Sequence, residues 1–359
     1  MMRFVFGALV LLLLIFSAPA MEASRQAALV FVQSVMPSLF PMMVLCHLVE
    51  KLPAKKGSRH VEMMETIAFC LLSGSPASAK RVHAFVQNDE HFTRNALPMM
   101  GFCGVMSPLF FLGALQSHLP KGVGLMLLIC HWLGAALTGA AAMLLCCRAK
   151  NPPRLRDASS LTKDVSTDLP ARPETLPLLR SLPGAIAAAM QGLLAVLGSM
   201  MLMGIVCAIL RRLLCLALPA GWQSPGFFAV IHGLMEVGGG CLALLEATAL
   251  PDLPLLCGLC GFGGLSIWMQ CLLFLGQEIR PGKLLLLRLF HGAVSYGICF
   301  LLLLILPKGI TAFSPAGVQV PFRDRWTASL LPAAALLLPL LPGLVRSFSG
   351  KPRTCSPHS

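Results

Sequence analysis

Hydrophobic stretches long enough to cross a bilayer recur along most of this chain, and short polar or basic loops separate them. After an apolar N-terminal segment within residues 1–25, such stretches occupy residues 26–49, 96–119, 122–147, 184–210, 254–275, 284–306 and 326–345. A helix needs about 20 mostly apolar residues to cross the hydrocarbon core. The pattern therefore predicts an all-α polytopic membrane protein with about seven transmembrane helices.

The N-terminal segment allows two interpretations. Arg3, the apolar run over residues 4–16 and the tripeptide Ala18-Pro19-Ala20 follow the order of a cleaved signal peptide. The same features suit an uncleaved first transmembrane helix over residues 1–25 that acts as a signal anchor, and this second interpretation is the one we expect.

Two further apolar segments, 61–86 and 225–250, are interrupted near the middle by residues that do not suit a lipid-facing helix. Residues 73–80 read Ser-Gly-Ser-Pro-Ala-Ser-Ala-Lys, and residues 232–240 contain Glu236 and three consecutive glycines. Broken backbone at membrane depth occurs only where protein or water covers it, because hydrocarbon offers no hydrogen-bond partners. Both segments are therefore predicted to be re-entrant hairpins that line a binding site.

The chain also matches itself at an offset of 158 to 160 residues. The Gly-Phe-x-Gly sequence at 101–104 falls on 261–264, Gly74 falls on Gly233, and His131 falls on His291. These matches define one gate-type unit over residues 26–147 and a second over residues 184–307. If each hairpin turns back, each unit crosses the membrane three times, so we expect two inverted repeats.

Basic residues between the hydrophobic segments indicate the orientation. With the N-terminus in the cytoplasm, the loop at 51–59, the polar, proline-rich linker at 148–183 and the basic end of the 308–359 region are also cytoplasmic. This arrangement agrees with the positive-inside rule. If residues 61–86 crossed the membrane fully, the linker would face outward, so the charge pattern favours the hairpin. We expect both termini in the cytoplasm.

Composition and motifs narrow the function classes. The chain is 56% hydrophobic and 12% charged, whereas globular domains are about 25% charged. Its net charge of +13 lies mostly in loops, where it meets lipid headgroups, so no nucleic acid is expected. Cys257 and Cys260 form a C-x-x-C spacing without a second pair, and no cofactor or metal is expected. Catalytic and phosphate-loop motifs are absent from the sequence, so we expect no enzyme.

The candidate site residues each have a plain structural alternative. An intramembrane carboxylate such as Glu236 indicates a substrate, cation or proton site, although it could be a solvated acid or a partner of Lys80. Serine hydroxyls at 73–78 could bind a ligand or bond back within a helix. Gln270 could recognise a base or amide, or join helices. His131 and His291 suit packing or proton transfer equally.

The predicted set is therefore as follows. The solute-binding residues are Ser73, Gly74, Ser75, Pro76, Ser78, Glu236, Gly238, Gly239, Gly263, Gly264, Ser266 and Gln270. The pair predicted as a proton relay is His131 and His291.

Six motifs in this order resemble the YlbJ family of sporulation integral membrane proteins, which belongs with the nucleoside-recognition, or gate, domain proteins. They are Pro-Ser-Leu-x-Pro (37–41), Ser-Gly-x-Pro-x-x-Ala-Lys (73–80), Ser-Pro-Leu-Phe (107–110), His-Trp-x-Gly (131–134), Glu-x-Gly (236–238) and Phe-Gly-Gly-Leu-Ser-Ile-x-x-Gln (262–270). The resemblance implies a bacterial inner-membrane protein of a spore-forming Firmicute. Its implied partners are the lipid bilayer, a small polar or nucleoside-like solute, a coupling ion and further copies of the chain.

The chain departs from the family pattern at four places. Ser75 stands where an aromatic residue is expected and Ser78 where a glycine is expected, and asparagines are missing near Ser107 and at Ala135. These departures favour a divergent solute or a site retained only for assembly. Two functions follow: a secondary transporter or gate for a small polar solute, or a non-transporting scaffold of the developing spore envelope.

Overall fold

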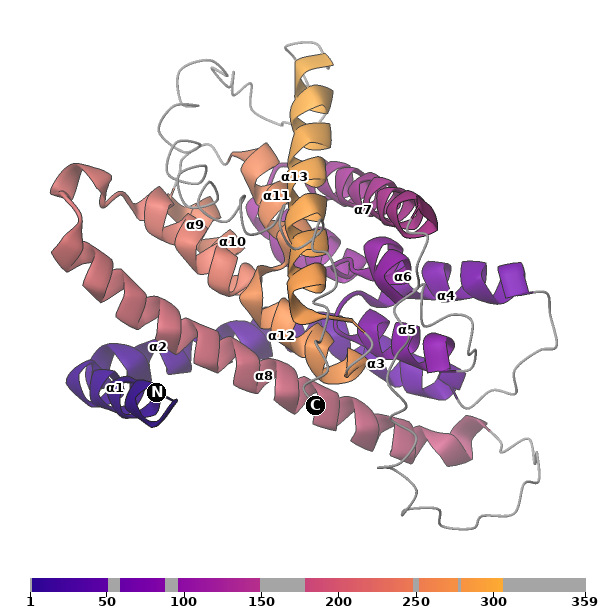
Figure 1. Ribbon diagram of the computed structural model, residues 1–359, viewed down its shortest axis with the longest axis horizontal. Coiled ribbons are helices and arrows are strands. Elements are labelled where there is room, and N and C mark those ends of the chain that lie inside the picture. The colour runs from indigo at the N-terminus through magenta and orange to yellow at the C-terminus, as the bar shows by residue number, and fades with distance from the viewer. Residues whose placement is uncertain are drawn as a thin grey trace, which may run out of the picture.

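The computed structural model describes residues 2–50, 59–87, 96–148, 178–247, 252–276 and 279–305, and its regular structure there is entirely helical (Figure 1). The first half contains α1 (Met2–Ile15), α2 (Ser17–Val30), a π-helical turn (Phe31–Val35), α3 (Met36–Glu50), α4 (Arg59–Ser73), α5 (Ala77–Gln87), α6 (Ala96–Cys103) and α7 (Val123–Arg148). The second half contains α8 (Leu178–Ala217), α9 (Pro225–Met235), α10 (Val237–Ala247), α11 (Leu253–Phe262), α12 (Gly264–Leu275) and α13 (Pro281–Ile305). The predicted helix at 326–345 and most of the linker lie outside the described residues.

Within the described ranges, five helical segments are long and apolar enough to cross a membrane. They are Ser17–Val49, Val123–Cys146, Arg180–Ala217, Leu253–Leu275 and Pro281–Ile305. Their length and composition confirm the prediction of an all-α membrane protein. Two boundaries differ from the sequence prediction: the break after α1 falls at Phe16, and α8 begins at Leu178 inside the predicted linker.

Both interrupted segments form tight helical hairpins. α4 and α5 turn back on each other at residues 74–76, so that the Cys70 thiol lies 3.8 Å from the Ser78 carbonyl oxygen. α9 and α10 turn back at Glu236, where Gly240 packs directly on the backbone of Gly233. The absence of a side chain at Gly240 permits the close approach of α9 and α10.

Two further segments are broken instead of folded back. In the first half, α6 ends at Cys103, residues 104–107 are non-helical, and a π-helix (Phe110–Leu115) follows. In the second half, Gly263 and Gly264 separate α11 from α12 with φ of 79° and 72°. Only glycine adopts this left-handed region routinely, so these two residues set the position of the break.

Long helices from the two halves pair with each other. α8 runs antiparallel to the α2–α3 segment, since Gly204 packs against Ala23 and Ala27 while Gly192 packs against Met43 (Figure 1). α7 and α13 cross, and there a side chain added at Gly134 would lie 3.2 Å from His291 Cδ2. The core is therefore built across the halves.

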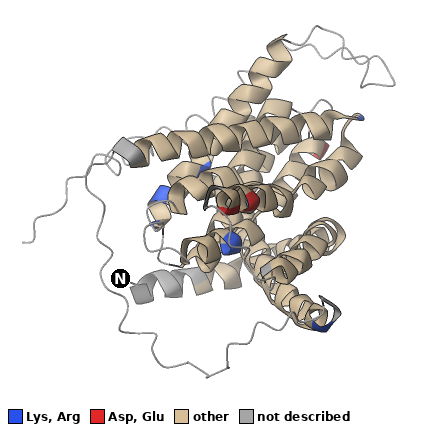
Figure 2. Cartoon of the chain, turned by 90° about the vertical axis from the view of Figure 1, so that its right-hand side faces the viewer, with Lys and Arg blue, Asp and Glu red and all other residues tan. Residues whose placement is uncertain are grey.

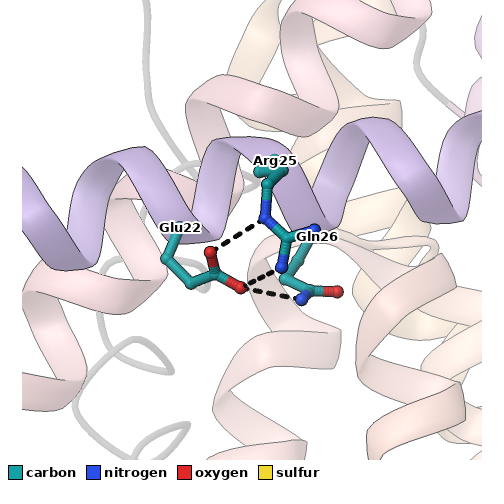
Figure 3. Close-up of polar contacts among 3 residues, drawn as sticks. All are labelled: Glu22, Arg25 and Gln26. Atoms are coloured by element: carbon teal, nitrogen blue, oxygen red, sulfur yellow. Dashed lines mark hydrogen bonds and ion pairs between the residues drawn. The ribbon is translucent and has the colours of Figure 1, made fainter.

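Charged residues are sparse along the described helices (Figure 2). One exposed cluster lies on α2, where Arg25 donates from Nε and Nη2 to the Glu22 carboxylate at 2.9 and 2.6 Å. Gln26 donates to the same carboxylate at 2.8 Å (Figure 3). These three side chains lie inside the apolar segment Ser17–Val49 and yet face outward.

Candidate functional site

A cavity lies where both hairpin tips meet the two broken helices. Its enclosed volume is about 40 Å³, which is room for a few water molecules. Its polar lining residues are Ser38, Ser75, Ser107, Glu236, Ser266 and Gln270, together with the backbone of Gly238. The remaining lining residues are apolar: Val35, Leu39, Met106, Phe110, Val196, Met200, Val237 and Ile267.

The first hairpin tip is held by the neighbouring broken helix. Gly74 has φ of 71°, and the Ser75 backbone N–H donates to the Val105 carbonyl at 2.6 Å. A side chain added at Gly74 would lie 2.7 Å from Cα of Ser107, so only glycine fits. The Ser75 hydroxyl lies 3.2 Å from that of Ser78. This tip therefore depends on contacts about thirty residues away in sequence.

The second hairpin tip is held by its own carboxylate. Glu236 is 4% exposed and directly precedes α10. Its Oε1 accepts the Gly238 N–H at 2.7 Å and its Oε2 accepts the Gly239 N–H at 2.6 Å. Glu236 therefore caps the N-terminus of α10, where the unpaired backbone amides carry about half a positive charge.

Lys80 does not pair with Glu236, although the sequence allowed that pairing. Its Nζ lies 3.0 Å from Nδ1 of His47, at a separate small cavity that Met43, Ala77 and Phe274 also line. The Glu236 carboxylate is instead bound by backbone amides of its own helix.

Three buried polar atoms on the cavity wall have no hydrogen-bond partner among the described residues: the hydroxyls of Ser107 and Ser266 and Oε1 of Gln270. The orientation of the Gln270 amide follows from its neighbour. Ser199 donates its hydroxyl proton to the Val196 carbonyl at 2.7 Å, so it can only accept from Gln270 Nε2. Oε1 is therefore the free atom. Unpaired buried polar groups cost free energy, so this wall is suited to a polar ligand or water.

The other predicted binding residues shape the site without lining it. Ser73 donates to the Cys70 carbonyl at 3.5 Å, and Pro76 follows a cis peptide bond at the first tip. A side chain added at Gly264 would lie 3.1 Å from the carbonyl oxygens of Gly233 and Met235. Of the twelve predicted residues, the cavity brings together Ser75, Glu236, Gly238, Ser266 and Gln270.

The predicted relay pair lies behind this cavity. The His131 and His291 rings stack with centroids 4.7 Å apart where α7 and α13 cross. Nε2 of His131 accepts the Met106 N–H at 3.0 Å, so this nitrogen carries no proton. Nε2 of His291 lies 3.1 Å from the His131 carbonyl. The pair supports the backbone beside Ser107, and proton transfer through it stays a prediction.

Three residues of interest were missing from the predicted set. Ser107 precedes a proline at a helix break, and Ser38 lies in a Pro-Ser-Leu-x-Pro segment after a π-helical turn, so both carried a weak signal. Arg288 on α13 is 1% exposed. It could have been found from the sequence, because a single arginine inside an apolar helix indicates a functional residue.

No metal site emerges from the cysteines. The Cys257 thiol donates to the Leu127 carbonyl and the Cys260 thiol lies beside Cys241, each at 3.8 Å. Within the described ranges, no group of three or more His, Cys, Asp or Glu residues is placed to hold a metal ion.

No protein-family model, curated protein or solved structure matches this chain.

Proposed function

We propose that this protein is a membrane transporter or gate that binds a small polar solute between its two hairpin tips. The observation that carries the proposal is the convergence of Ser75, Glu236, Ser266 and Gln270 on one cavity, although they lie up to 195 residues apart in sequence (75 to 270). Polar groups of transporters meet in this way at the interface of discontinuous helices.

The arrangement of the halves supports an inverted repeat. Each half has a long helix, a helical hairpin, a broken span and a second long helix, in that order. The first long helices of the halves, α2–α3 and α8, run antiparallel, as equivalent helices do in inverted repeats. The second long helices meet at the equivalent residues His131 and His291. We infer that each half contributes three full spans and one re-entrant hairpin.

The lining favours a solute that donates hydrogen bonds and carries no negative charge. Gln270 Oε1 is an acceptor and Glu236 retains lone pairs on its carboxylate, and no Lys, Arg or His among the described residues lines the cavity. An anion about 5 Å from the carboxylate would be repelled by about 3 kcal/mol at an effective dielectric constant of about 20. Nucleosides, which the family resemblance suggests, satisfy this condition, and nucleotides do not.

Solute binding to the purified protein tests the proposal. We expect a nucleoside-like solute to bind and its phosphate ester to bind at least tenfold more weakly. Gln270→Met should weaken binding by about tenfold, since one hydrogen bond of about 1.4 kcal/mol is lost. Gln191→Met is the control, because Gln191 is exposed on α8. Equal binding by both variants would place the solute elsewhere.

A second candidate function is a membrane scaffold of the spore envelope. It is favoured by the self-sufficient contacts of Glu236, whose two oxygens already accept backbone amides, and by the Ser75–Ser78 hydroxyl pair. Sporulation and solute uptake in proteoliposomes distinguish the two functions. If Glu236→Gln and Ser75→Ala leave both intact, the cavity has no role in either.

We also propose that the protein lies in a bacterial inner membrane with both termini in the cytoplasm. The orientation can be tested with Ser160→Cys in the linker, compared with the wild-type chain. We expect an impermeant thiol reagent to label this cysteine from the cytoplasmic side only. Labelling from the other side would overturn the inverted arrangement.

A further inference from the structure

A buried guanidinium connects the two broken helices. Arg288 on α13 is 1% exposed, and its Nε donates to the Phe262 carbonyl at 3.0 Å while its Nη1 donates to the Gly104 carbonyl. Phe262 is the last residue of α11, and Gly104 directly follows α6. Arg288 therefore bonds to the C-terminal ends of two half-helices, one from each half of the chain.

These helix ends offset part of the charge of Arg288, whose Nη2 has no hydrogen-bond partner among the described residues. No carboxylate among the described residues forms an ion pair with it. A helix C-terminus carries about half a negative charge, so two of them amount to about one. A buried charge without such compensation would be very costly.

In transporters with broken helices, unwound carbonyls and half-helix C-termini are the groups that coordinate a coupling cation. Here the guanidinium occupies that place. The glycines at both breaks admit it, since a side chain added at Gly104 would lie 2.9 Å from Nη1 and one at Gly263 would overlap Nη2.

We propose that Arg288 is a built-in cation, which fills a carbonyl site at the two helix breaks that would otherwise take a monovalent metal ion. The site adjoins the cavity, because Gly104 precedes Val105, whose carbonyl holds the Ser75 N–H. Solute binding therefore needs no sodium at this position. That consequence rests on the proposed transport function, whereas the cation site itself does not.

Thermal unfolding of the purified full-length protein tests the site without any solute. The melting temperature is measured in sodium, potassium and choline chloride at equal ionic strength. For the wild type we expect equal values in all three salts. Arg288→Ala should melt lower in choline, and sodium or potassium should raise its Tm saturably by about 5 °C as the ion takes the vacated carbonyls.

Three further variants complete the design. Arg288→Lys keeps a charge at the site and should remain insensitive to the choice of cation. Arg212→Ala removes an exposed arginine of α8 and should behave like the wild type in every salt. Arg288→Gln, which retains hydrogen-bond donors, replaces Arg288→Ala if the alanine variant does not fold, and the same cation response is expected.

Two results would overturn the proposal. The first is a wild-type Tm that rises saturably with sodium but not with choline, and this result is obtained without any variant. The second is a folded Arg288→Ala or Arg288→Gln protein with the same Tm in all three salts. Cation-dependent stabilisation of the variant in a protein that binds no solute would uphold the built-in cation and reject only the proposed function.

Discussion

The two hairpin tips achieve the same sharp reversal by different means. The tip between α4 and α5 has no charged side chain and is fixed from outside, through the Val105 carbonyl and the close contact of Gly74 with Ser107. The tip between α9 and α10 is fixed locally, by the Glu236 carboxylate on the amides of Gly238 and Gly239. The first tip therefore depends on a backbone hydrogen bond to its neighbouring broken helix. The second tip is capped within its own hairpin and meets its broken helix through the close packing of Gly264 on the Gly233 and Met235 carbonyls.

This difference suggests which tip is free to move. A hairpin that carries its own cap can swing away from the cavity without breaking its turn. The α4–α5 hairpin donates a backbone hydrogen bond to residues 104–107, so it must move together with them or lose that bond. We therefore expect the α9–α10 hairpin to be the mobile gate and the α4–α5 hairpin to belong to the fixed wall.

The largest effect is expected from Gly74→Ala. The new side chain would force a residue with φ of 71° and would overlap the Ser107 backbone. We expect a loss of about 3 kcal/mol or more in unfolding free energy, seen as a Tm drop above 5 °C.

Gly233→Ala changes the matching repeat position of the other hairpin, where a side chain would lie 2.8 Å from the flexible end of Leu259. It should cost about 1 kcal/mol. Gly198→Ala, with nothing within 4 Å, is the control. Equal losses for Gly74→Ala and Gly233→Ala would remove the proposed difference between the tips.

Glu236→Gln should have the next largest effect. An amide oxygen can accept only one of the two backbone N–H groups and carries no charge to interact with the helix N-terminus. We expect a loss of about 1 to 2 kcal/mol, measured as a lower Tm of the purified protein. Glu246→Gln on the exposed face of α10 should leave the Tm unchanged. If both variants have the same Tm, the carboxylate does not hold this tip.

Ser75→Ala should have a smaller effect, although Ser75 lies at the centre of the first tip. The contact that fixes this tip is made by the backbone N–H, which alanine retains. The hydroxyl contacts with Ser78 and with the Cys271 thiol are lost, which costs about 0.5 to 1 kcal/mol. Ser117→Ala, at an exposed position, is the control for the Tm measurement. A loss as large as that of Glu236→Gln would mean that side chains fix both tips.

Ser266→Ala should give the smallest change in stability, and one of opposite sign. Its hydroxyl is buried without a partner among the described residues, so its removal should leave the Tm unchanged or raise it by about 1 °C. The same variant should weaken solute binding. A lower Tm would show that the hydroxyl is satisfied in the protein alone, and that the cavity wall is structural.

The sequence predicted both hairpins because each depends on local residue types. Gly74 and Pro76 in one segment and the glycines after Glu236 in the other cannot continue a lipid-facing helix. The matching break at Gly263 and Gly264 follows from the same rule. The convergence of the tips was also predicted, from the repeat.

The remaining features depend on tertiary contacts that no local pattern contains. Ser38 reaches the cavity because a π-helical turn re-aims α3, and Ser107 does so because Gly74 packs on its backbone. The free oxygen of Gln270 is determined by Ser199 on another helix. Arg288 appeared as a single charge in an apolar helix, and its role required knowing which two carbonyls it meets.

The exposed ion pair of Glu22 and Arg25 indicates where along α2 the surface of the hydrocarbon core is expected (Figure 3). Two outward-facing charges are poorly tolerated in hydrocarbon, so we expect the acyl chains to begin after Arg25. From there to Val49 the helix still offers about 35 Å at 1.5 Å per residue, enough to cross. Gly204 of antiparallel α8 packs at the same level, so we expect Arg211 and Arg212 to extend into the headgroups. We therefore expect the paired helices to project beyond the bilayer together.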